Sequence, residues 1–423
     1  MAGAATPSTR RVLAASLIGT SIEFYDFYVY TTAAALVFGE LFFPQASRAA
    51  QQLLAFATIG VAFVARPLGS IFFGHFGDRV GRKSTLVASL LTMGISTTLV
   101  AFLPTYLTAG WIAALLLCVL RFGQGFGLGG EWGGAALLAV EHAPPGKRAR
   151  YGMFPQLGAP VGFIAANGLF LILGALLTPA QFHDWGWRVP FVLSAALVVV
   201  GLWIRLRLAE TPEFAASLAE APPPKVPLGE LLSRHFGALA VGTIGAVACF
   251  ALYYVATAFM LGYGTKTLGY SMKAFLGIQL GAILFMAIGI YAAAWLSDRR
   301  YDERRVLMAG CVGTMLAGLL MAPLMNSGSL FAVFLFLALS LTLMGFVYGP
   351  LGAWLPGLFP ARVRYTGASM AFNVAGVLGG GLTPLIAQTL ALRGGLLWVG
   401  LYSGGAALIS LVALALHGRA RTA

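Results

Sequence analysis

The sequence predicts an all-α membrane protein with 12 transmembrane helices in two halves of six. Its 423 residues are 59% hydrophobic and only 10% charged, and the mean hydropathy is +0.85. The apolar runs are about 20 residues or longer, which is the length that a helix needs to cross a hydrocarbon layer of roughly 30 Å. Strands of a membrane barrel would instead show alternating polarity over about ten residues. These observations exclude an ordinary soluble enzyme.

Twelve apolar segments account for most of the chain, and one polar linker separates the sixth from the seventh. The linker contains Pro222, Pro223 and Pro224 together with four glutamates. We therefore predict an N-terminal bundle at 1–208, a cytoplasmic linker at 209–236 and a C-terminal bundle at 237–423. The predicted helices span residues 12–38, 52–74, 84–103, 110–141, 151–177, 189–208, 237–262, 274–296, 305–323, 330–356, 366–391 and 395–416.

Basic residues are distributed unevenly between the two sides of this arrangement. Twenty of the 27 Lys and Arg residues fall on the side of the two termini, two lie inside spans, and five lie on the other side, namely Arg48, Arg188, Lys266, Lys273 and Arg393. Because loops rich in Lys and Arg stay in the cytoplasm, we expect both termini to be cytoplasmic. The net charge of +13 then reflects membrane orientation and does not indicate a nucleic-acid partner.

The two halves carry the same markers in the same order. A polar loop at residues 74–83 follows the second span, and its Asp78 corresponds to Asp298 after the eighth span. Residues 148–152 follow the fourth span, and the similar string 362–367 follows the tenth. Parallel repeats about an axis along the membrane normal, with a binding site between them at the midplane, are an arrangement found in secondary transporters.

These motifs resemble those of the major facilitator superfamily, and more narrowly its metabolite:proton symporter branch. The loop string marks the superfamily, whereas the strings in the first and fourth helices together indicate the branch. Members of this branch carry shikimate, citrate, 2-oxoglutarate, proline or betaine. The matching residues are Gly74, Asp78, Arg79, Gly81, Arg82 and Lys83 in the loop, 22–27 in the first helix, 65–69 in the second, 121–125 and 129–132 in the fourth, and 359–367 before the eleventh.

The resemblance implies a carrier in the bacterial inner membrane that moves a small polar metabolite by alternating access. We expect a proton-coupled symporter whose partners are a small-molecule substrate, protons and the lipid bilayer, and which works as a monomer. An organic carboxylate is the favoured substrate, because arginine charge in a cavity attracts anions. A zwitterion such as betaine or proline, or a proton-driven exporter of drugs or metabolites, is the alternative.

Five ionisable residues lie well inside the predicted spans, away from the span ends, and all of them are in the first half: Glu23, Asp26, Arg66, Arg121 and Glu131. Such residues are costly in lipid and are functional candidates by default. Glu23 and Asp26 lie about one turn apart on one helix face, so the two do not easily ionise together. We expect Arg121 to pair with one of them in one conformation and to release it when a proton or substrate binds. A permanent ion pair that orients the first and fourth helices is the alternative.

Arg66 and Glu131 lie nearer the cytoplasmic side of their spans. Arg66, which precedes Pro67, is a candidate anchor for a substrate carboxylate, or else an arginine that extends to the cytoplasmic surface. Glu131 lies ten residues beyond Arg121, about 15 Å along the helix, and is a second candidate proton site. A structural ion pair with Arg66 or Arg79 is an equal alternative for Glu131.

Polar and aromatic residues within the spans complete the candidate substrate site. Hydroxyl, amide and indole N–H groups orient a small polar solute, although each of these residue types also occurs in ordinary helix packing. Besides Arg66 and Arg121, the candidates are Tyr25, Tyr28, Trp132, Tyr253, Gln279, Tyr348 and Asn373.

The loop at residues 74–83 is predicted to be a hinge and a conformational latch. Its glycines permit a tight turn, and its basic residues hold it at the anionic inner leaflet. We expect Asp78 to latch the cytoplasmic side while the carrier faces outward, with a weaker counterpart around Asp298. The predicted latch residues are Gly74, Asp78, Arg79, Gly81, Arg82, Arg150 and Asp298.

Other kinds of site find no support in the sequence. The glycines at 125, 127, 129 and 130 follow no strand and precede no Gly-Lys-Ser/Thr, so we interpret them as points of close helix packing and not as a phosphate loop. The five histidines show no metal-ligand spacing and no catalytic set. We therefore expect no enzyme, no metal and no cofactor, with the proton as the coupling ion.

Overall fold

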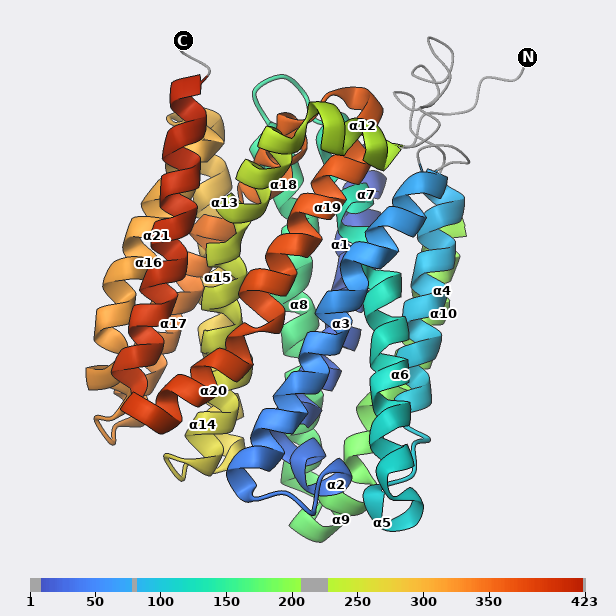
Figure 1. Cartoon of the computed structure of the whole chain (residues 1–423), viewed down its shortest axis with the longest axis vertical. Coiled ribbons are helices and arrows are strands. Elements are labelled where there is room, and N and C mark those ends of the chain that lie inside the picture. The colour runs from blue at the N-terminus through green and yellow to red at the C-terminus, as the bar shows by residue number, and fades with distance from the viewer. Residues whose placement is uncertain (1–8, 78–81, 207–226, 421–423) are drawn as a thin grey trace.

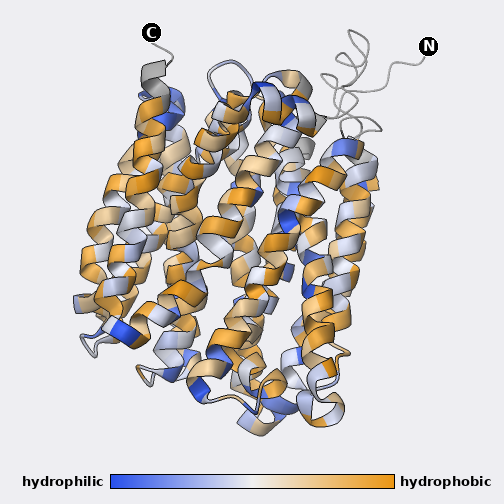
Figure 2. Cartoon of the chain, in the orientation of Figure 1, coloured by the Kyte–Doolittle hydropathy of each residue, from blue (hydrophilic) through white to orange (hydrophobic). Residues whose placement is uncertain are grey.

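The computed structural model describes residues 9–77, 82–206 and 227–420. Within these residues every regular element is helical, and the helices stand roughly parallel in a bundle in which the first helix begins and the last helix ends on the same side (Figure 1). We call that side the basic end, because it carries the excess of Lys and Arg, and the other side the opposite end. Apolar residues dominate the length of the bundle, and polar residues gather at its two ends (Figure 2).

The N-terminal half contains six helical rods, some built from consecutive segments. Short helices at the opposite end, α5 (Tyr106–Ala109) and α9 (Pro179–Asp184), join neighbouring rods. The rods are α1 (Thr9–Ala33) with the π-helical turn η1 (Ala34–Phe38) and α2 (Gly39–Phe42); α3 (Arg48–Gly77); α4 (Arg82–Val100); α6 (Trp111–Leu128) with α7 (Glu131–Glu141); α8 (Arg148–Leu176); and the 3-10 turn η2 (Gly186–Arg188) with α10 (Val189–Leu206).

The C-terminal half repeats this plan. It begins with a short helix, α12 (Pro227–Arg234), at the basic end. The six rods are α13 (Phe236–Tyr254) with the π-helical turn η3 (Val255–Phe259) and α14 (Met260–Lys266); α15 (Met272–Arg299); α16 (Glu303–Met325); α17 (Leu330–Tyr348) with α18 (Leu351–Trp354); α19 (Arg364–Gly376) with the π-helical turn η6 (Val377–Gly381) and α20 (Thr383–Gly394); and α21 (Leu396–Ala420). The 3-10 turns η4 (Pro356–Leu358) and η5 (Ala361–Val363) connect α18 to α19.

Each of the 12 predicted segments is therefore a helix or a run of helical segments. Among the described residues, ten rods are long and apolar enough to cross a membrane. The other two are α4, whose apolar part is the shorter stretch Ser84–Val100, and the first rod, which carries Glu23 and Asp26. Large apolar side chains such as Val64, Leu107 and Leu316 are exposed on the outside of the bundle, as a lipid-facing surface requires.

The predicted linker is only partly described, because residues 207–226 lie outside the described part of the chain. Its last part forms α12, whose Leu231 is fully buried. This helix packs against α13, α19 and α3, so it touches both halves. The predicted linker thus includes a packed helix at its C-terminal part.

Two pairs of helices form the main contact between the halves. Helix α8 packs along α15, and α3 packs along α19. Helices α3 and α19 run side by side near the front of the view in Figure 1. Because each pair joins one helix from each half, any movement of the halves relative to one another must slide or separate these helices.

Glycines set the closest approach of α3 to α6. A Cβ atom on Gly125 would lie 2.2 Å from the carbonyl oxygen of Ala62, and one on Gly129 would lie 2.1 Å from that of Arg66. On the facing helix, a Cβ on Gly69 would lie 1.9 Å from the carbonyl oxygen of Phe126. The prediction that the glycines of the fourth span serve close helix packing is confirmed.

Candidate functional site

A cavity lies in the middle of the bundle, between the two halves. It is small, about 50 Å³, which is room for a few water molecules. Both halves contribute its walls, which consist of Glu23, Phe24, Phe27, Arg66, Leu128, Trp132, Ala159, Cys249, Phe250, Tyr253, Tyr254, Met344, Tyr348, Phe372 and Asn373. The arrangement is that of a closed site, which must widen to hold a metabolite.

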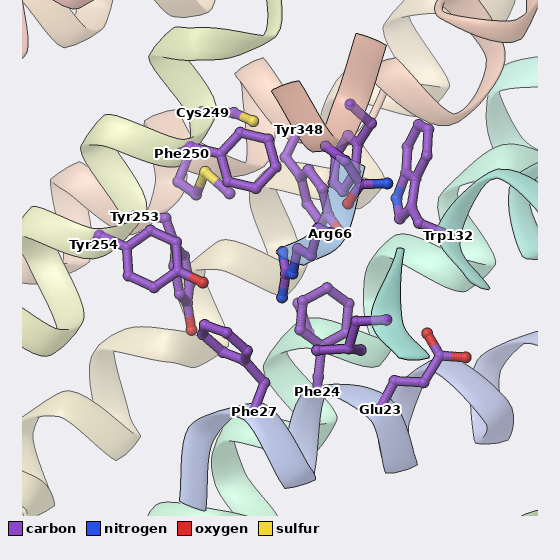
Figure 3. Close-up of a pocket in the computed structure, with 15 residues that line it drawn as sticks. Glu23, Phe24, Phe27, Arg66, Trp132, Cys249, Phe250, Tyr253, Tyr254 and Tyr348 are labelled. Atoms are coloured by element: carbon purple, nitrogen blue, oxygen red, sulfur yellow. The ribbon is translucent and has the colours of Figure 1, made fainter. Parts of the chain in front are cut away.

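Arg66 is the charged group at the centre of this cavity (Figure 3). Its side chain is 7% exposed, so it does not extend to the cytoplasmic surface as one alternative predicted. The guanidinium lies 4.4 Å from the ring centre of Phe63 and 4.7 Å from that of Phe27, within the range of cation–π attraction. Among the described residues no carboxylate forms an ion pair with it, and its Nε has no hydrogen-bond acceptor.

Aromatic rings from both halves form much of the cavity wall. Trp132 stacks on Phe372 with ring centres 3.8 Å apart and planes 2° from parallel. The Trp132 indole donates a hydrogen bond of 3.0 Å to Gln156 Oε1, and Gln156 Nε2 donates one of 2.9 Å to the carbonyl oxygen of Tyr348. The buried hydroxyls of Tyr253 and Tyr348 have no hydrogen-bond partner among the described residues. They are therefore available to a polar solute.

Sequence reasoning placed six of these wall residues at the candidate site: Glu23, Arg66, Trp132, Tyr253, Tyr348 and Asn373. Four other predicted substrate residues, Tyr25, Tyr28, Gln279 and Arg121, do not line the cavity. The Tyr25 hydroxyl donates to the carbonyl oxygen of Pro190 at 2.9 Å, and Tyr28 packs behind Tyr253 with ring centres 5.7 Å apart. Gln279 Nε2 donates to the carbonyl oxygens of Ala256 and Thr257, and so supports the π-helical turn η3.

A buried network of three charged side chains adjoins the cavity. Arg205 Nη2 lies 2.6 Å from Glu23 Oε1, and Arg205 Nη1 lies 2.7 Å from Glu131 Oε1. Ser89 donates a hydrogen bond of 2.9 Å to Glu131, and Arg205 also donates to the carbonyl oxygen of Leu86. The network joins α1, α7 and α10, with two carboxylates on one guanidinium.

Sequence reasoning missed Arg205 as a member of this site. It assigned Arg205 to the cytoplasmic basic residues, and it proposed Arg66 or Arg79 as the structural partner of Glu131. The structure pairs Glu131 with Arg205 instead, because the last turn of α10 lies beside α4 and α1. A signal was present, since two acids deep in the first half need a cation and Arg205 ends an otherwise apolar span.

Arg121 pairs with neither Glu23 nor Asp26 in this conformation, contrary to the simplest form of the predicted pairing. Its guanidinium lies 3.8 Å from the ring centre of Tyr30 and 4.6 Å from that of Phe27, and it donates to Gln124. The same Gln124 donates to the backbone oxygen of Asp26 at 3.0 Å. Thus Arg121 and Asp26 are linked through Gln124 without direct contact of their charges.

The Asp26 carboxylate itself is fully buried. Neither of its oxygens has a hydrogen-bond donor within the described part of the chain. Neither Asp26, Arg121 nor Glu131 lines the cavity. Of the predicted proton-coupling residues, only Glu23 does.

The basic end is closed by contacts between the halves. Asp298, at the end of α15, accepts hydrogen bonds from the backbone N–H groups of Ala149 and Arg150, each 3.0 Å, and from Arg150 Nε at 2.9 Å. A carboxylate at the N-terminus of α8 satisfies otherwise unpaired N–H groups and meets the positive end of the helix dipole. The structure thus brings together the predicted latch residues Asp298 and Arg150.

Further predicted latch residues are described only in part. Gly74 lies against Thr366 of α19, where an added Cβ would be 3.2 Å from the Thr366 hydroxyl. Asp78, Arg79 and Gly81 lie outside the described residues, and of Arg82 only the backbone at the start of α4 is described.

Polar contacts between α19 and the first half add to this closure. Asn373 Nδ2 donates to Ser70 Oγ at 2.7 Å and to the carbonyl oxygen of Gly129 at 3.0 Å, and Tyr365 donates to Gly130. On the other side of the cavity Phe27, Phe63 and Tyr254 contact one another edge to face. Closure is therefore polar toward the basic end and aromatic toward the opposite end.

Comparison with known proteins agrees with this architecture. The profile of the Major Facilitator Superfamily matches residues 16–384. The chain belongs to the major facilitator superfamily. It is 50% identical over 413 residues to the inner membrane metabolite transport protein YhjE of Escherichia coli K12, covering 97% of this chain and 94% of that protein. This facilitator is therefore a multi-pass membrane protein and a metabolite transporter, not an enzyme.

Other relatives of the facilitator differ in what their names say they carry. The shikimate transporter of E. coli K12 is 41% identical over 385 residues, covering 90% of this chain and 87% of its own. The proline/betaine transporter of E. coli K12 is 32% identical over 390 residues, covering 90% of this chain and 77% of its own.

Solved structures of very different sequence share the fold of the facilitator. The proton:xylose symporter XylE of E. coli superposes with a TM-score of 0.75 at 16% identity, over 96% of this chain and 94% of that one. The human organic anion transporter MFSD10 superposes with a TM-score of 0.69 at 17% identity, over 97% of this chain and 100% of that one. At this identity the likeness shows the fold alone.

Proposed function

We propose that this facilitator is a proton-coupled symporter that imports a small organic carboxylate across the bacterial inner membrane, with its basic end and both termini in the cytoplasm. One observation carries the proposal: Arg66 places a guanidinium in the central cavity without a carboxylate partner among the described residues. A buried unpaired charge is costly, and a bound anion would remove that cost. A planar guanidinium also fits a carboxylate with two parallel hydrogen bonds.

Glu23 is the residue through which proton and substrate binding are coupled in this proposal. It lines the cavity and also pairs with Arg205, which is shared with Glu131. With both carboxylates ionised the three groups carry one net negative charge, and one proton neutralises them. Loss of that proton on the cytoplasmic side would leave a negative charge beside the bound anion and favour release of the anion.

Asp26 and Arg121 form the second part of the coupling proposal. Both charges are buried and lack an ionic partner among the described residues, although Gln124 connects them. Direct pairing would require the Arg121 guanidinium to leave Gln124 and the Tyr30 ring. We propose that this pair forms in another state of the cycle, and that Asp26 exchanges a proton as it forms.

Uptake of radiolabelled shikimate and glycine betaine, with and without a protonophore, tests the proposal. Accumulation of shikimate that the protonophore abolishes is the expected result. Accumulation of betaine alone would support the zwitterion alternative, for which the aromatic rings around Arg66 offer a cation–π site. Proton-driven accumulation of the labelled compounds inside inverted vesicles, whose lumen corresponds to the outside of the cell, would assign an exporter instead.

Arg66→Lys separates an anion anchor from a packing role. Lysine keeps the charge and most of the length but loses the two-pronged hydrogen bond. The KM for shikimate should rise about tenfold, as the loss of one charge-assisted hydrogen bond of about 1.5 kcal/mol implies. An unchanged KM would exclude Arg66 as the anchor.

Glu23→Gln separates coupling from translocation. The variant should still exchange external labelled shikimate for internal unlabelled shikimate, because exchange needs no net proton movement. It should lose accumulation driven by a pH gradient. Accumulation equal to that of the wild type would remove Glu23 from the coupling role.

A further inference from the structure

Two clefts open between the halves at the opposite end. The first, about 610 Å³, lies between the α1–α2 rod, α8 and α9 of one half and α14 and α15 of the other. The second, about 460 Å³, lies between α2, α3, α14 and α20. Glu40, Thr265 and Lys266 line both clefts, so the two meet. We call this joined space the outer vestibule.

The outer vestibule is basic. Arg48, Lys266 and Lys273 line it, whereas Glu40 is its one acidic lining residue among those described. With His183 neutral, these lining residues carry a net charge of +2. His183 Nε2 lies 3.4 Å from Glu40 Oε2, and its protonation would make the vestibule still more positive.

This clustering runs against the charge rule for membrane proteins. Lys and Arg are kept low on the side away from the cytoplasm, and this chain places only five there. Three of the five line the outer vestibule, while Arg188 and Arg393 lie outside it. These few cations lie together at the opening between the halves. Their electric fields therefore add at the point where a solute must pass.

A helix terminus strengthens this field. Ser271, Met272 and Lys273 line the first cleft, and they form the N-cap and first turn of the 28-residue helix α15. The N-terminus of a helix carries about half a positive charge from its aligned peptide dipoles. The cations and the dipole thus act in the same direction.

We propose that the outer vestibule is a first binding site for small organic anions, which gather there before they reach Arg66. The identity of the transported ligand as a carboxylate rests on the proposed function. A cleft lined by charge of one sign and walled by low-dielectric protein raises the local concentration of opposite charge and the rate of association. The site binds by charge and not by shape, so its occupancy falls as salt rises.

Cysteine modification measures the vestibule field without any transported substrate. Thr267 is exposed and lines the second cleft next to Lys266, so Thr267→Cys places a thiol in the outer vestibule. The readout is the ratio of modification rates with an anionic and a cationic methanethiosulfonate reagent, after subtraction of the parent chain. Because both reagents attack the same thiolate, the ratio cancels changes in thiol reactivity.

Charge substitutions combined with Thr267→Cys should shift this ratio in opposite directions, depending on the sign of the charge removed. Lys266→Gln with Lys273→Gln should lower it roughly tenfold at low salt, whereas Glu40→Gln should raise it. Arg393→Gln is the matched control, a cation of the same face outside both clefts, and should change it little. Equal ratios in the Thr267→Cys parent and in all three charge variants of it would overturn the proposal.

Uptake kinetics connect the vestibule to transport. For labelled shikimate, Lys266→Gln with Lys273→Gln should lower kcat/KM severalfold at low salt, leave kcat nearly unchanged and flatten the salt dependence. A normal kcat/KM with the expected modification ratios would show a basic vestibule that does not supply the cavity, and would overturn the proposal. If wild-type protein takes up no organic acid at all, the proposed function fails, while the modification ratios still decide whether the vestibule attracts anions.

Discussion

Arg205 holds the charge network of this facilitator together. Its guanidinium contacts both Glu23 and Glu131 at 2.6–2.7 Å, and all three side chains are at least nine-tenths buried. Removing one partner from a buried ion pair costs more than the pair contributes, because the remaining charge stays in a low-dielectric site. The two glutamates would be left facing each other without a cation.

Arg205→Gln should therefore destabilise the protein by about 3–5 kcal/mol. Thermal unfolding of the purified protein in detergent measures the effect. Arg188→Gln is the matched control, since Arg188 precedes the same helix and its side chain donates to backbone carbonyl oxygens. Adding Glu131→Gln to Arg205→Gln should restore part of the stability, because it removes the repulsion between the carboxylates. If Arg205→Gln alone has the same melting temperature as the Arg188→Gln control, this account is wrong.

Local sequence pattern predicted which residues line the cavity better than it predicted which residues contact one another. Glu23, Arg66 and Asn373 were predicted from their polarity within apolar spans, and all three line the cavity. The pairing of Arg205 with Glu23 joins residues 182 positions apart, and no local spacing contains that information. Charge balance within a half is the physical constraint that could have indicated it.

The contact of α3 with α6 depends on glycine. An alanine at 125 would bring its Cβ to 2.2 Å from the Ala62 oxygen and 2.5 Å from the Ala62 Cα, both backbone atoms that cannot rotate away. Gly125→Ala should destabilise the protein by about 1–3 kcal/mol through overpacking. Gly168→Ala in α8 is the matched control, because its Cβ would meet no atom within 4 Å. Thermal unfolding of the two variants compares them, and equal melting temperatures would refute the packing argument.

The N-terminus of α8 is held by a residue of the other half. Asp298 caps it from the other half, whereas Asp302 caps only its own helix, α16. Asp298→Asn should lower the transport rate several times more than it weakens shikimate binding, because it loosens the closed basic end and leaves the cavity intact. Asp302 is an acid four residues away, and Asp302→Asn should leave the transport rate nearly unchanged. Equal losses in rate and binding for Asp298→Asn would count against a latch.

The sequence predicted the helices themselves well and their irregularities poorly. All 12 apolar segments are helical, since length and hydropathy are local properties. The π-helical turns η1, η3 and η6 were not predicted, and two of them, η1 and η3, occur in the first rod of each half. Such turns arise where packing forces an extra residue into the helix, and that depends on neighbours far away in the chain.

At the scale of the whole molecule, the two halves must separate at the basic end before a solute can leave toward it. The contacts there join α3 to α19 and α8 to α15 directly, whereas the outer vestibule lies between the halves at the opposite end. The structure therefore combines a basic end closed by polar contacts with an opposite end where the outer vestibule opens, and the aromatic contacts of Phe27, Phe63 and Tyr254 are not part of the vestibule lining.

A disulfide between Gly74 and Thr366 would test whether that closure must break in each cycle. A Cβ built on Gly74 lies 3.8 Å from the Cβ of Thr366, which is the mean separation in a disulfide. Gly74→Cys with Thr366→Cys, once oxidised, should abolish shikimate uptake, and a reductant should restore it. Either cysteine alone should respond to neither treatment, because the three native cysteines are unpaired and lie within the spans. Binding of shikimate from the outside should survive oxidation, since the lock joins only the basic ends of α3 and α19. Full uptake by the oxidised double variant would show that these two helices need not part, and the rocking of one half against the other would have to be replaced by a smaller motion.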